Sequence, residues 1–222
     1  MVDSPATASS PSVLWRVGRS SNPLNFSEIA PEDAALSSGG NRFDVPGGQV
    51  LYAATKPQGA FAETLARFRP TAGMLALPPE EDEHLMAVGA IPADWRVKRQ
   101  LATFSLEQPL PFLDVDSPET HTFLTQVMAP QLEALGIPNL DVAIVRGANR
   151  FVTRAIAEWA YVAVDDEGSP VYSGLRYESR LGPHECWAIF SGVEIVRATF
   201  EAIPRTNPDI AAVARVFGLT IH

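Results

Sequence analysis

A chain of 222 residues, of which 46% are hydrophobic, is long enough to bury a core, and this composition excludes a wholly disordered protein. The formal net charge of −9 argues against a nucleic-acid-binding protein, because such proteins usually present a basic surface to phosphates. The one cysteine, Cys186, excludes an internal disulfide, and no apolar run reaches the roughly 18–20 residues of a membrane-spanning helix. We therefore expect a cytoplasmic protein that binds neither nucleic acid nor membrane.

The N-terminus is rich in Ser, Ala and Pro, and it has neither the basic residues nor the apolar stretch of a secretory signal. We expect residues 1–11 to form a flexible tail and residues 12–222 to form one domain. A first strand is predicted over residues 12–17, and a long irregular segment follows at 18–40. Irregular segments of this length inside a compact domain are usually functional or mobile.

A strand and a helix follow the irregular segment. The apolar run at 49–54 predicts a buried strand, and residues 58–68 predict a helix that presents Ala62 and Leu65 to the core. Pro70 ends this helix, because proline cannot continue the backbone hydrogen-bond pattern.

The rest of the chain alternates between short strands and helices. Strands are predicted at 74–77, 86–91, 100–106, 112–115, 174–179, 186–190 and 194–202. Helices are predicted at 120–135, with a bend near Pro130, at 149–162 and at 207–217. An acidic run at 80–83, beside His84, is expected to be a solvated loop. The order lacks a regular βαβ repeat and any GxGxxG or Walker sequence, so we expect an α+β or mixed α/β domain that is neither a Rossmann nor a P-loop fold.

Candidate chemistry begins with an arginine, a tyrosine and a glutamate within one stretch of sequence. Arg42 follows a pair of glycines, Tyr52 lies in the predicted buried strand, and Glu63 lies on the next helix. Each residue also has a purely structural interpretation. Arg42 can be a surface loop residue, Tyr52 a core aromatic, and Glu63 a surface carboxylate that pairs with Arg67 at i+4.

A second polar block lies in the predicted strand near the end of the chain. Alternation along a strand places Tyr177 and Ser179 on one face and Arg176 and Arg180 on the other. The hydroxyl of Ser179, at the end of the strand, is suited to bind a sugar or a phosphate. The structural interpretation is a strand-ending serine with no further role.

Together the two blocks resemble the RES family, which is named for its Arg, Glu and Ser. The resemblance spans about residues 12–202, and the order and separation of its pieces are more specific than any piece alone. These pieces are Leu14-Trp15-Arg16-Val17, Gly40-Asn41-Arg42-Phe43, Leu51-Tyr52-Ala53-Ala54, Glu63, Leu175-Arg176-Tyr177-Glu178-Ser179-Arg180 and Phe190. The chain departs from the family pattern in its long connection at 18–40 and in Cys186, where a polar residue is expected.

The resemblance implies a fold similar to that of ADP-ribosyltransferases, with central twisted sheets flanked by helices. It also implies an enzyme that consumes NAD⁺ by hydrolysis or by phosphorolysis. NAD⁺ and, for phosphorolysis, inorganic phosphate are then substrates, and neither a cofactor nor a metal is implied. Many family members are toxins silenced by a neighbouring Xre-like antitoxin, so such a partner is expected here. Dimers or larger complexes with an antitoxin also fit the resemblance.

The resemblance assigns a role to each candidate residue. Glu63 stabilises the positive charge that develops on the ribose and holds a ribose hydroxyl. A single carboxylate suffices, because nicotinamide is already a good leaving group and needs no general acid. Arg42 and Arg16 clamp the pyrophosphate, since a guanidinium matches phosphate geometry. Tyr52 stacks against the nicotinamide or packs the pocket wall, and Ser179 binds the substrate near the ribose.

Other polar residues receive structural interpretations. Arg176 and Arg180 are weaker candidates, because alternation places them opposite Ser179. His121 lacks a second metal ligand, and Cys186 is expected to be a small buried hydrophobe. Two further activities stay open at this level: transfer of ADP-ribose to a protein or nucleotide acceptor, and a non-catalytic module that binds NAD⁺.

Overall fold

An eight-stranded sheet is the frame of the protein, whose computed structural model describes residues 3–76 and 87–222. The strand order is β1-β6-β7-β8-β3-β2-β5-β9, and neighbouring strands are antiparallel except for the parallel pair β6–β7. A second, two-stranded sheet joins β10 and β4 in parallel. The strands are β1 Thr7–Ala8, β2 Leu14–Arg19, β3 Val50–Ala54, β4 Ala90–Ile91, β5 Arg99–Leu106, β6 Phe112–Asp114, β7 Gly174–Glu178, β8 Glu185–Phe190, β9 Ile195–Ala202 and β10 Thr220–Ile221.

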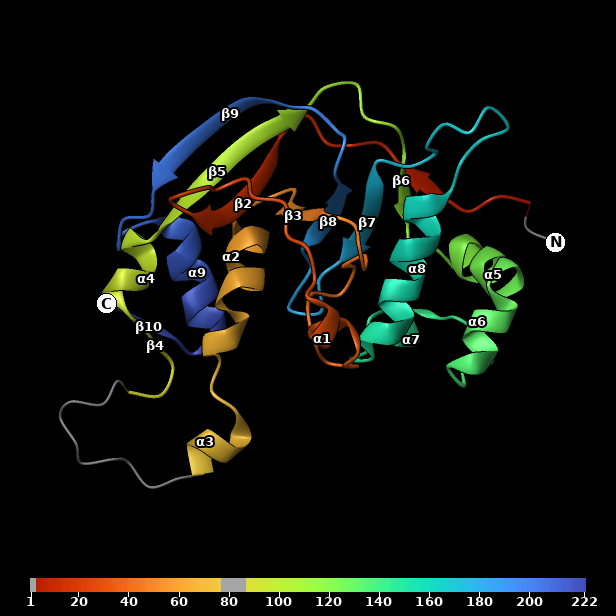
Figure 1. Ribbon diagram of the computed structural model, residues 1–222. Helices are drawn as coiled ribbons and strands as arrows, with labels where there is room; N and C mark the ends of the chain where they lie inside the picture. Colours follow the sequence, from red (N-terminus) through yellow and green to blue (C-terminus); the bar gives the residue numbers. More distant parts are fainter. Residues whose placement is uncertain (1–2, 77–86) are drawn as a thin grey trace.

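The sheet curls over two groups of helices (Figure 1). Helices α2, α4 and α9 lie under the half that contains β2, β5 and β9, and α5 to α8 lie under the half that contains β6 and β7. The helices are α1 Pro31–Ala34, α2 Pro57–Leu65 with the 3₁₀ turn η1 Ala66–Phe68, α3 Ala72–Ala76, α4 Ala93–Val97, α5 Pro118–Val127, α6 Ala129–Ala134, α7 Val142–Val145, α8 Arg150–Val162 and α9 Pro208–Phe217. This is the mixed α/β domain that the sequence predicts. Over the described residues, no helix combines the length and the apolar character needed to cross a membrane.

Both faces of the central strands are covered by apolar side chains. Along β3, Val50 and Ala54 join the large core between the sheet and the helices, whereas Leu51 and Ala53 join a smaller core with Trp187. Alternate side chains of a strand point to opposite faces, so a strand buried on both faces must be apolar almost throughout. This explains why the predicted strand at 49–54 is a continuous apolar run.

Helix α2 carries the predicted catalytic glutamate next to the sheet. Pro57 lies in its first turn, where a missing N–H costs nothing, and Phe61 and Leu65 are buried on its core face. The helix contacts both β2 and α9. Its exposed side holds Glu63.

A buried arginine attaches the long irregular segment to α8. Asn149 caps this helix by accepting a hydrogen bond from the Phe151 N–H at 3.0 Å. One turn further on, Arg154 donates hydrogen bonds of 2.7–3.0 Å to the carbonyl oxygens of Ala34, Leu36 and Gly39. Apart from the short helix α1, the segment lacks regular structure, and these three carbonyls bond to a side chain rather than to a neighbouring strand.

Most of the predicted elements are confirmed, with ends shifted by one or a few residues. The strand predicted at 74–77 is wrong, because Ala72–Ala76 forms helix α3. Ala, Met and Leu favour helices, and the Thr71 hydroxyl accepts the Met74 N–H at 3.2 Å as a cap. The predicted bend near Pro130 is confirmed as the boundary between α5 and α6.

Three short helices, α1, α4 and α7, have no counterpart in the prediction, and α1 lies within the segment predicted to be irregular. All three are too short to show helical periodicity, and α7 begins where Asp141 accepts the Ile144 N–H at 2.8 Å. Of the strand predicted at 86–91, Ala90–Ile91 forms β4. Residues 77 and 86, the acidic run at 80–83 and His84 lie outside the described residues.

Part of the expected flexible tail belongs to the sheet. Thr7 and Ala8 form β1, which pairs antiparallel with β6, and the Ala6 N–H donates to the Thr120 hydroxyl at 3.1 Å. An edge strand offers unpaired backbone groups that any chain segment can bond, so no apolar pattern is needed in β1. The anchored part of the tail therefore could not be read from composition.

Replacing Gly174 by alanine is expected to destabilise the protein strongly. The φ of Gly174 is +152°, and an added Cβ would lie 2.1 Å from the Ala188 carbonyl oxygen and 2.8 Å from the Phe112 ring. Backbone strain and overpacking together should lower the free energy of unfolding by about 3 kcal/mol or more. Urea denaturation measures this change.

Gly73→Ala is the matched control, because its Cβ would meet only one atom at 3.9 Å in an exposed helix. It should leave stability unchanged or raise it slightly. Equal losses in the two variants would contradict the assigned role of Gly174.

Candidate functional site

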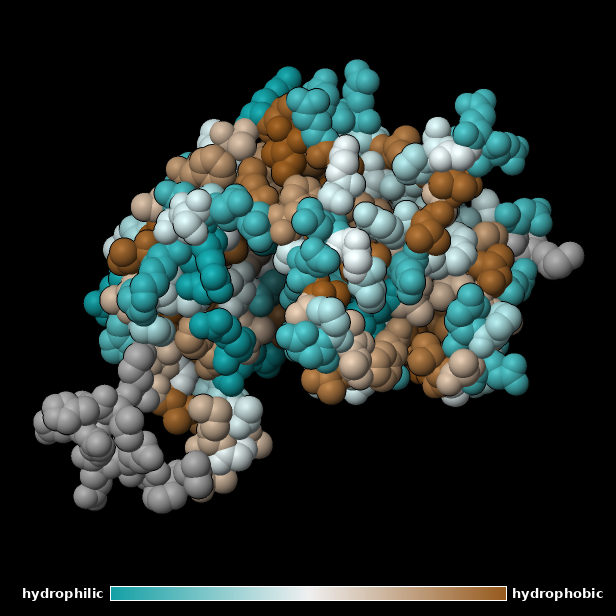
Figure 2. Space-filling view, in the orientation of Figure 1, coloured by the Kyte–Doolittle hydropathy of each residue, from teal (hydrophilic) through white to brown (hydrophobic). Residues whose placement is uncertain are grey.

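A pocket of about 470 Å³ opens between α2, strands β2 and β3, the end of β7, the start of α8 and the irregular segment. The surface in Figure 2 is hollowed between the part over α2 and the part over α1. The lining is mostly polar and includes four arginines. It consists of Trp15, Arg16, Val17, Ser27, Asn41, Arg42, Tyr52, Ala53, Ala54, Ala60, Glu63, Thr64, Ala66, Arg150, Tyr177, Arg180 and Leu181. Its volume is in the range of small-molecule pockets.

Among the described residues, Glu63 provides the only carboxylate in this lining. The Ser179 hydroxyl donates a hydrogen bond of 2.5 Å to Glu63 Oε1. Ser179 is 5% exposed, and its oxygen accepts the Leu181 N–H at 3.0 Å. The serine therefore lies behind the glutamate, holding one carboxylate oxygen in place while Glu63 remains exposed to the pocket.

This geometry favours the functional interpretation of Glu63. The alternative pairing with Arg67 is not among the ion pairs of the described residues, and the Arg67 guanidinium lies 4.9 Å from the centre of the Phe68 ring. For Ser179, the sequence predicts a contact with substrate. The Ser179 hydroxyl has one hydrogen to donate, and that hydrogen is bonded to Glu63. The structure therefore assigns Ser179 to positioning the Glu63 carboxylate rather than to donating to the substrate.

Tyr52 lines the pocket and also closes the loop that carries Arg42. Its hydroxyl donates to Asp44 Oδ1 at 2.8 Å and accepts the Phe43 N–H at 3.1 Å. Asp44 in turn accepts the Asn41 N–H at 2.6 Å. Burial, followed by the charge of Asp44, raises the pKa of Tyr52 well above its usual value, so the phenol stays protonated. The Tyr52 ring therefore forms part of the pocket wall, while its hydroxyl is fully engaged in hydrogen bonds to the loop.

Arg16 lines the pocket, but most of its hydrogen bonds hold backbone. It donates to the carbonyl oxygens of Tyr52 at 2.7 Å, Pro23 at 3.0 Å and Asn25 at 3.3 Å. Burial lowers the pKa of Arg16 to about 10. Of the five N–H groups of a guanidinium, few remain for a ligand.

Arg42 is also largely engaged within the protein. It is 8% exposed, it donates to the carbonyl oxygens of Val145 at 2.8 Å and Glu178 at 3.4 Å, and it lies 5.0 Å from the Phe43 ring centre. Its Nε has no hydrogen-bond partner among the described residues. Burial lowers the pKa of Arg42. Like Arg16, it supports the pocket and reaches it with few donors.

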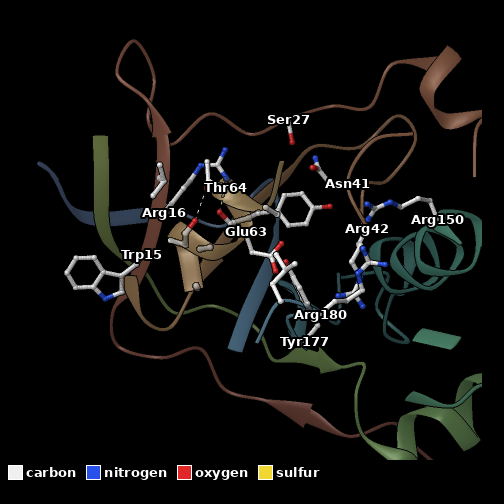
Figure 3. Close-up of a pocket in the computed structure, with 17 residues that line it drawn as sticks. Trp15, Arg16, Ser27, Asn41, Arg42, Glu63, Thr64, Arg150, Tyr177 and Arg180 are labelled. Atoms are coloured by element: carbon white, nitrogen blue, oxygen red, sulfur yellow. Dashed lines mark hydrogen bonds between the residues drawn. The ribbon is translucent and has the colours of Figure 1, made fainter. Parts of the chain in front are cut away.

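Two further arginines, Arg150 and Arg180, complete the pocket. The sequence made Arg180 only a weaker candidate, and it did not predict Arg150 as a ligand. Figure 3 shows Glu63 between Arg16 on one side and Arg42, Arg150 and Arg180 on the other. Arg180 lies beyond Glu178, where β7 ends, so strand alternation no longer fixes its direction. Arg176 does follow alternation and pairs away from the pocket with Asp114 and Glu185.

The sequence held one signal for Arg150. It is the first residue of an amphipathic helix directly after a capping Asn149, and helix N-termini attract anions. Burial, followed by the charge of Arg180, lowers the pKa of Arg150, so the two guanidinium groups lie within electrostatic reach of each other. Neighbouring cations without matching carboxylates are suited to phosphate groups.

The remaining polar residues are structural. Cys186 is fully buried, and burial, followed by the charge of Glu63, raises the pKa of its thiol, so it is no nucleophile. His121 is buried with Nε2 2.9 Å from the Val115 carbonyl oxygen. Within 3–76 and 87–222, no three His, Cys, Asp or Glu side chains are grouped as metal ligands.

Removing the Tyr52 hydroxyl should destabilise the loop that carries Arg42. Tyr52→Phe leaves the buried carboxylate of Asp44 and the Phe43 N–H without this partner, which should lower the free energy of unfolding by about 1–3 kcal/mol. Denaturation in urea tests this. Tyr172→Phe is the control, since Tyr172 is buried and its hydroxyl makes no hydrogen bond to the described residues. A loss as large in Tyr172→Phe would refute the assignment.

Comparison with known proteins places the chain in a family. No curated protein matches the sequence. Among solved structures, a chain of the MbcT-MbcA toxin–antitoxin complex of M. tuberculosis is similar at 11% identity, with a TM-score of 0.45 over 98% of this chain and 94% of that chain. The model of the RES domain matches residues 13–206, which include every predicted site residue. The chain therefore belongs to the RES domain family.

Proposed function

We propose that this protein cleaves the nicotinamide–ribose bond of NAD⁺ and is the toxin of a toxin–antitoxin pair. The observation that carries the enzymatic proposal is a single carboxylate, Glu63, fixed by Ser179 in a pocket lined by arginines. The toxin role and an Xre-like antitoxin partner are proposed on family membership alone.

The proposed reaction needs one anion at the ribose. As the bond between C1′ and the nicotinamide nitrogen breaks, its electron pair moves to the nitrogen, which becomes neutral, and positive charge develops on the ribose. Glu63 stabilises that charge and accepts a hydrogen bond from a ribose hydroxyl. Water, or inorganic phosphate in the case of phosphorolysis, then bonds to C1′ and loses a proton. No second carboxylate is required, because the leaving group needs no proton.

The arginines match the anionic part of NAD⁺. Arg150 and Arg180 have the most donors to spare and hold the pyrophosphate, with Arg42 behind them. This extends the predicted clamp, in which Arg42 acted with Arg16. Arg16 braces the opposite wall, and the Tyr52 ring offers a face on which nicotinamide can pack. Local positive charge thereby offsets the net charge of −9 on the chain.

Glu63→Gln is expected to lower kcat for NAD⁺ by about 100-fold or more, because a neutral amide cannot stabilise the developing charge. Release of nicotinamide from NAD⁺ by the purified chain is the measurement. Glu158→Gln on the exposed side of α8 is the matched control and should keep full activity. Absence of turnover in the wild-type chain, or full turnover in Glu63→Gln, would refute the proposal.

The same assay separates the candidate reactions. With phosphate present, a phosphorylated ribose product indicates phosphorolysis; free ADP-ribose indicates hydrolysis. Transfer of label from NAD⁺ to a protein or nucleotide would indicate an ADP-ribosyltransferase, and binding without turnover a non-catalytic module.

Ser179→Ala should lower kcat by about tenfold and leave KM nearly unchanged. The variant removes the bond that orients Glu63 but no contact with substrate, and loss of one charge-assisted hydrogen bond is worth about 1.5–3 kcal/mol. Steady-state kinetics with NAD⁺ measures both constants. A raised KM with an unchanged kcat would show that the hydroxyl binds substrate instead.

A further inference from the structure

A second hollow, of about 520 Å³, lies beside the first and carries a different set of charges. Four of its lining residues are basic, Arg19, Arg67, Lys98 and Arg99, and one, Asp94, is acidic. The two hollows have no lining residue in common over the described part of the chain. Figure 2 shows hydrophilic residues gathered over α2 and α4 on this side of the molecule. A concentration of positive charge is notable on a chain of net charge −9.

Backbone pairing forces two of these arginines together. Arg19 at the end of β2 and Arg99 at the start of β5 are directly opposed across the antiparallel ladder. Like charges in this position repel and destabilise a sheet. Burial, followed by the charges of Arg67 and Arg19, lowers the pKa of Arg99, which agrees with a close cationic group. An anion bound between them would relieve this repulsion.

Two of the guanidinium groups, those of Arg99 and Arg67, are held in place and have donors to spare. Arg99 lies 4.8 Å from the Trp95 ring centre and donates one bond, of 3.2 Å, to the Trp95 carbonyl oxygen. The flat face of the Arg67 guanidinium stacks on the Phe68 ring. The N–H groups at the edge of the guanidinium remain available to a ligand. The one acid of the lining, Asp94, pairs with Lys98 at 2.6 Å on the exposed surface. Three arginines thus remain without a carboxylate among the described residues of the lining.

We propose that Arg19, Arg67 and Arg99 form a second anion site that binds the adjacent phosphate groups of a small molecule, either an inorganic pyrophosphate or a nucleoside diphosphate. A guanidinium fork matches a phosphate, and three forks around one hollow favour a ligand with more than one phosphate. The volume is that of a small-molecule pocket. The negative charge of the whole chain disfavours a nucleic acid as the ligand. The site is independent of the proposed NAD⁺ reaction.

The test is calorimetric titration of the full chain with inorganic pyrophosphate and with ADP at constant ionic strength. The double variant Arg19→Gln/Arg67→Gln should bind pyrophosphate at this hollow about tenfold more weakly or worse, because it removes two of the three guanidinium groups that the phosphates would contact. Because the first pocket is itself proposed to hold a pyrophosphate, Arg150→Gln should weaken binding there and leave the binding at the second hollow unchanged. Tighter binding of ADP identifies a nucleotide ligand; equal binding identifies the diphosphate as the whole recognised group.

Matched controls distinguish a specific binding site from nonspecific attraction by the positively charged side chains of the protein. Arg197→Gln/Arg205→Gln removes the same charge from two exposed arginines elsewhere, and it should leave pyrophosphate binding unchanged. Arg19→Gln alone should raise thermal stability in the absence of ligand, because it removes the repulsion with Arg99. This second measurement separates a binding role from a role in folding.

Three results would overturn the proposal. An equal loss of binding in the Arg197→Gln/Arg205→Gln control would show that only bulk charge matters. Tighter binding to a DNA duplex than to pyrophosphate would identify a nucleic-acid surface. A tenfold rise in KM for NAD⁺ in the Arg19→Gln/Arg67→Gln variant would show that the second hollow belongs to the NAD⁺ site and is not a separate site. The titration does not depend on turnover of NAD⁺. If the chain fails to cleave NAD⁺, the pyrophosphate titration still tests the second anion site.

Discussion

The pocket depends on hydrogen bonds between buried arginines and backbone carbonyl oxygens. The irregular segment after β2 has few backbone partners, and a buried carbonyl without a partner is costly. Arg16 bonds the carbonyls of Pro23 and Asn25, and Arg154 bonds those of Ala34, Leu36 and Gly39. These bonds fix the segment as one wall of the pocket without any strand or long helix.

The same constraint divides the arginines of the site into two kinds. Arg16 and Arg42 donate most of their hydrogen bonds to backbone carbonyl oxygens and thereby define the shape of the pocket. Arg150 and Arg180 make few hydrogen bonds within the protein, and they supply the accessible positive charge. A family pattern cannot separate these kinds, because an arginine that holds the backbone and an arginine that holds a ligand are equally hard to replace.

The catalytic proposal rests on two elements that are far apart in sequence. Glu63 comes from α2 and Ser179 from the end of β7, and their 2.5 Å bond joins them at the edge of the pocket. Strand β2 and the 3₁₀ turn η1, which continues α2, also line the second hollow, where Arg67 follows Glu63 by four residues and Arg19 follows Arg16 by three. An anion bound to Arg19 and Arg67 would therefore contact β2 and the turn that extends α2.

Much of the fold could be predicted, since it depends on local patterns. The apolar strand at 49–54 and the amphipathic helix at 149–162 were placed well because periodicity and capping act within a few residues. Helix α3 was mistaken for a strand and α4 was missed, because four or five residues carry no clear period. Strand β1 was missed because its pairing with β6 uses backbone groups only.

The mixed α/β class and the RES family could be predicted from the residue patterns, which also pointed to Arg42, Tyr52, Glu63 and Ser179 as candidates. What each of these side chains contacts becomes apparent only in the folded protein. Ser179 donates to Glu63, the Tyr52 hydroxyl bonds the loop that carries Arg42, and Arg150 with Arg180 adds positive charge to the pocket. A hydrogen-bond donor bonds whatever acceptor lies within about 3 Å, and packing between distant segments sets which acceptor that is.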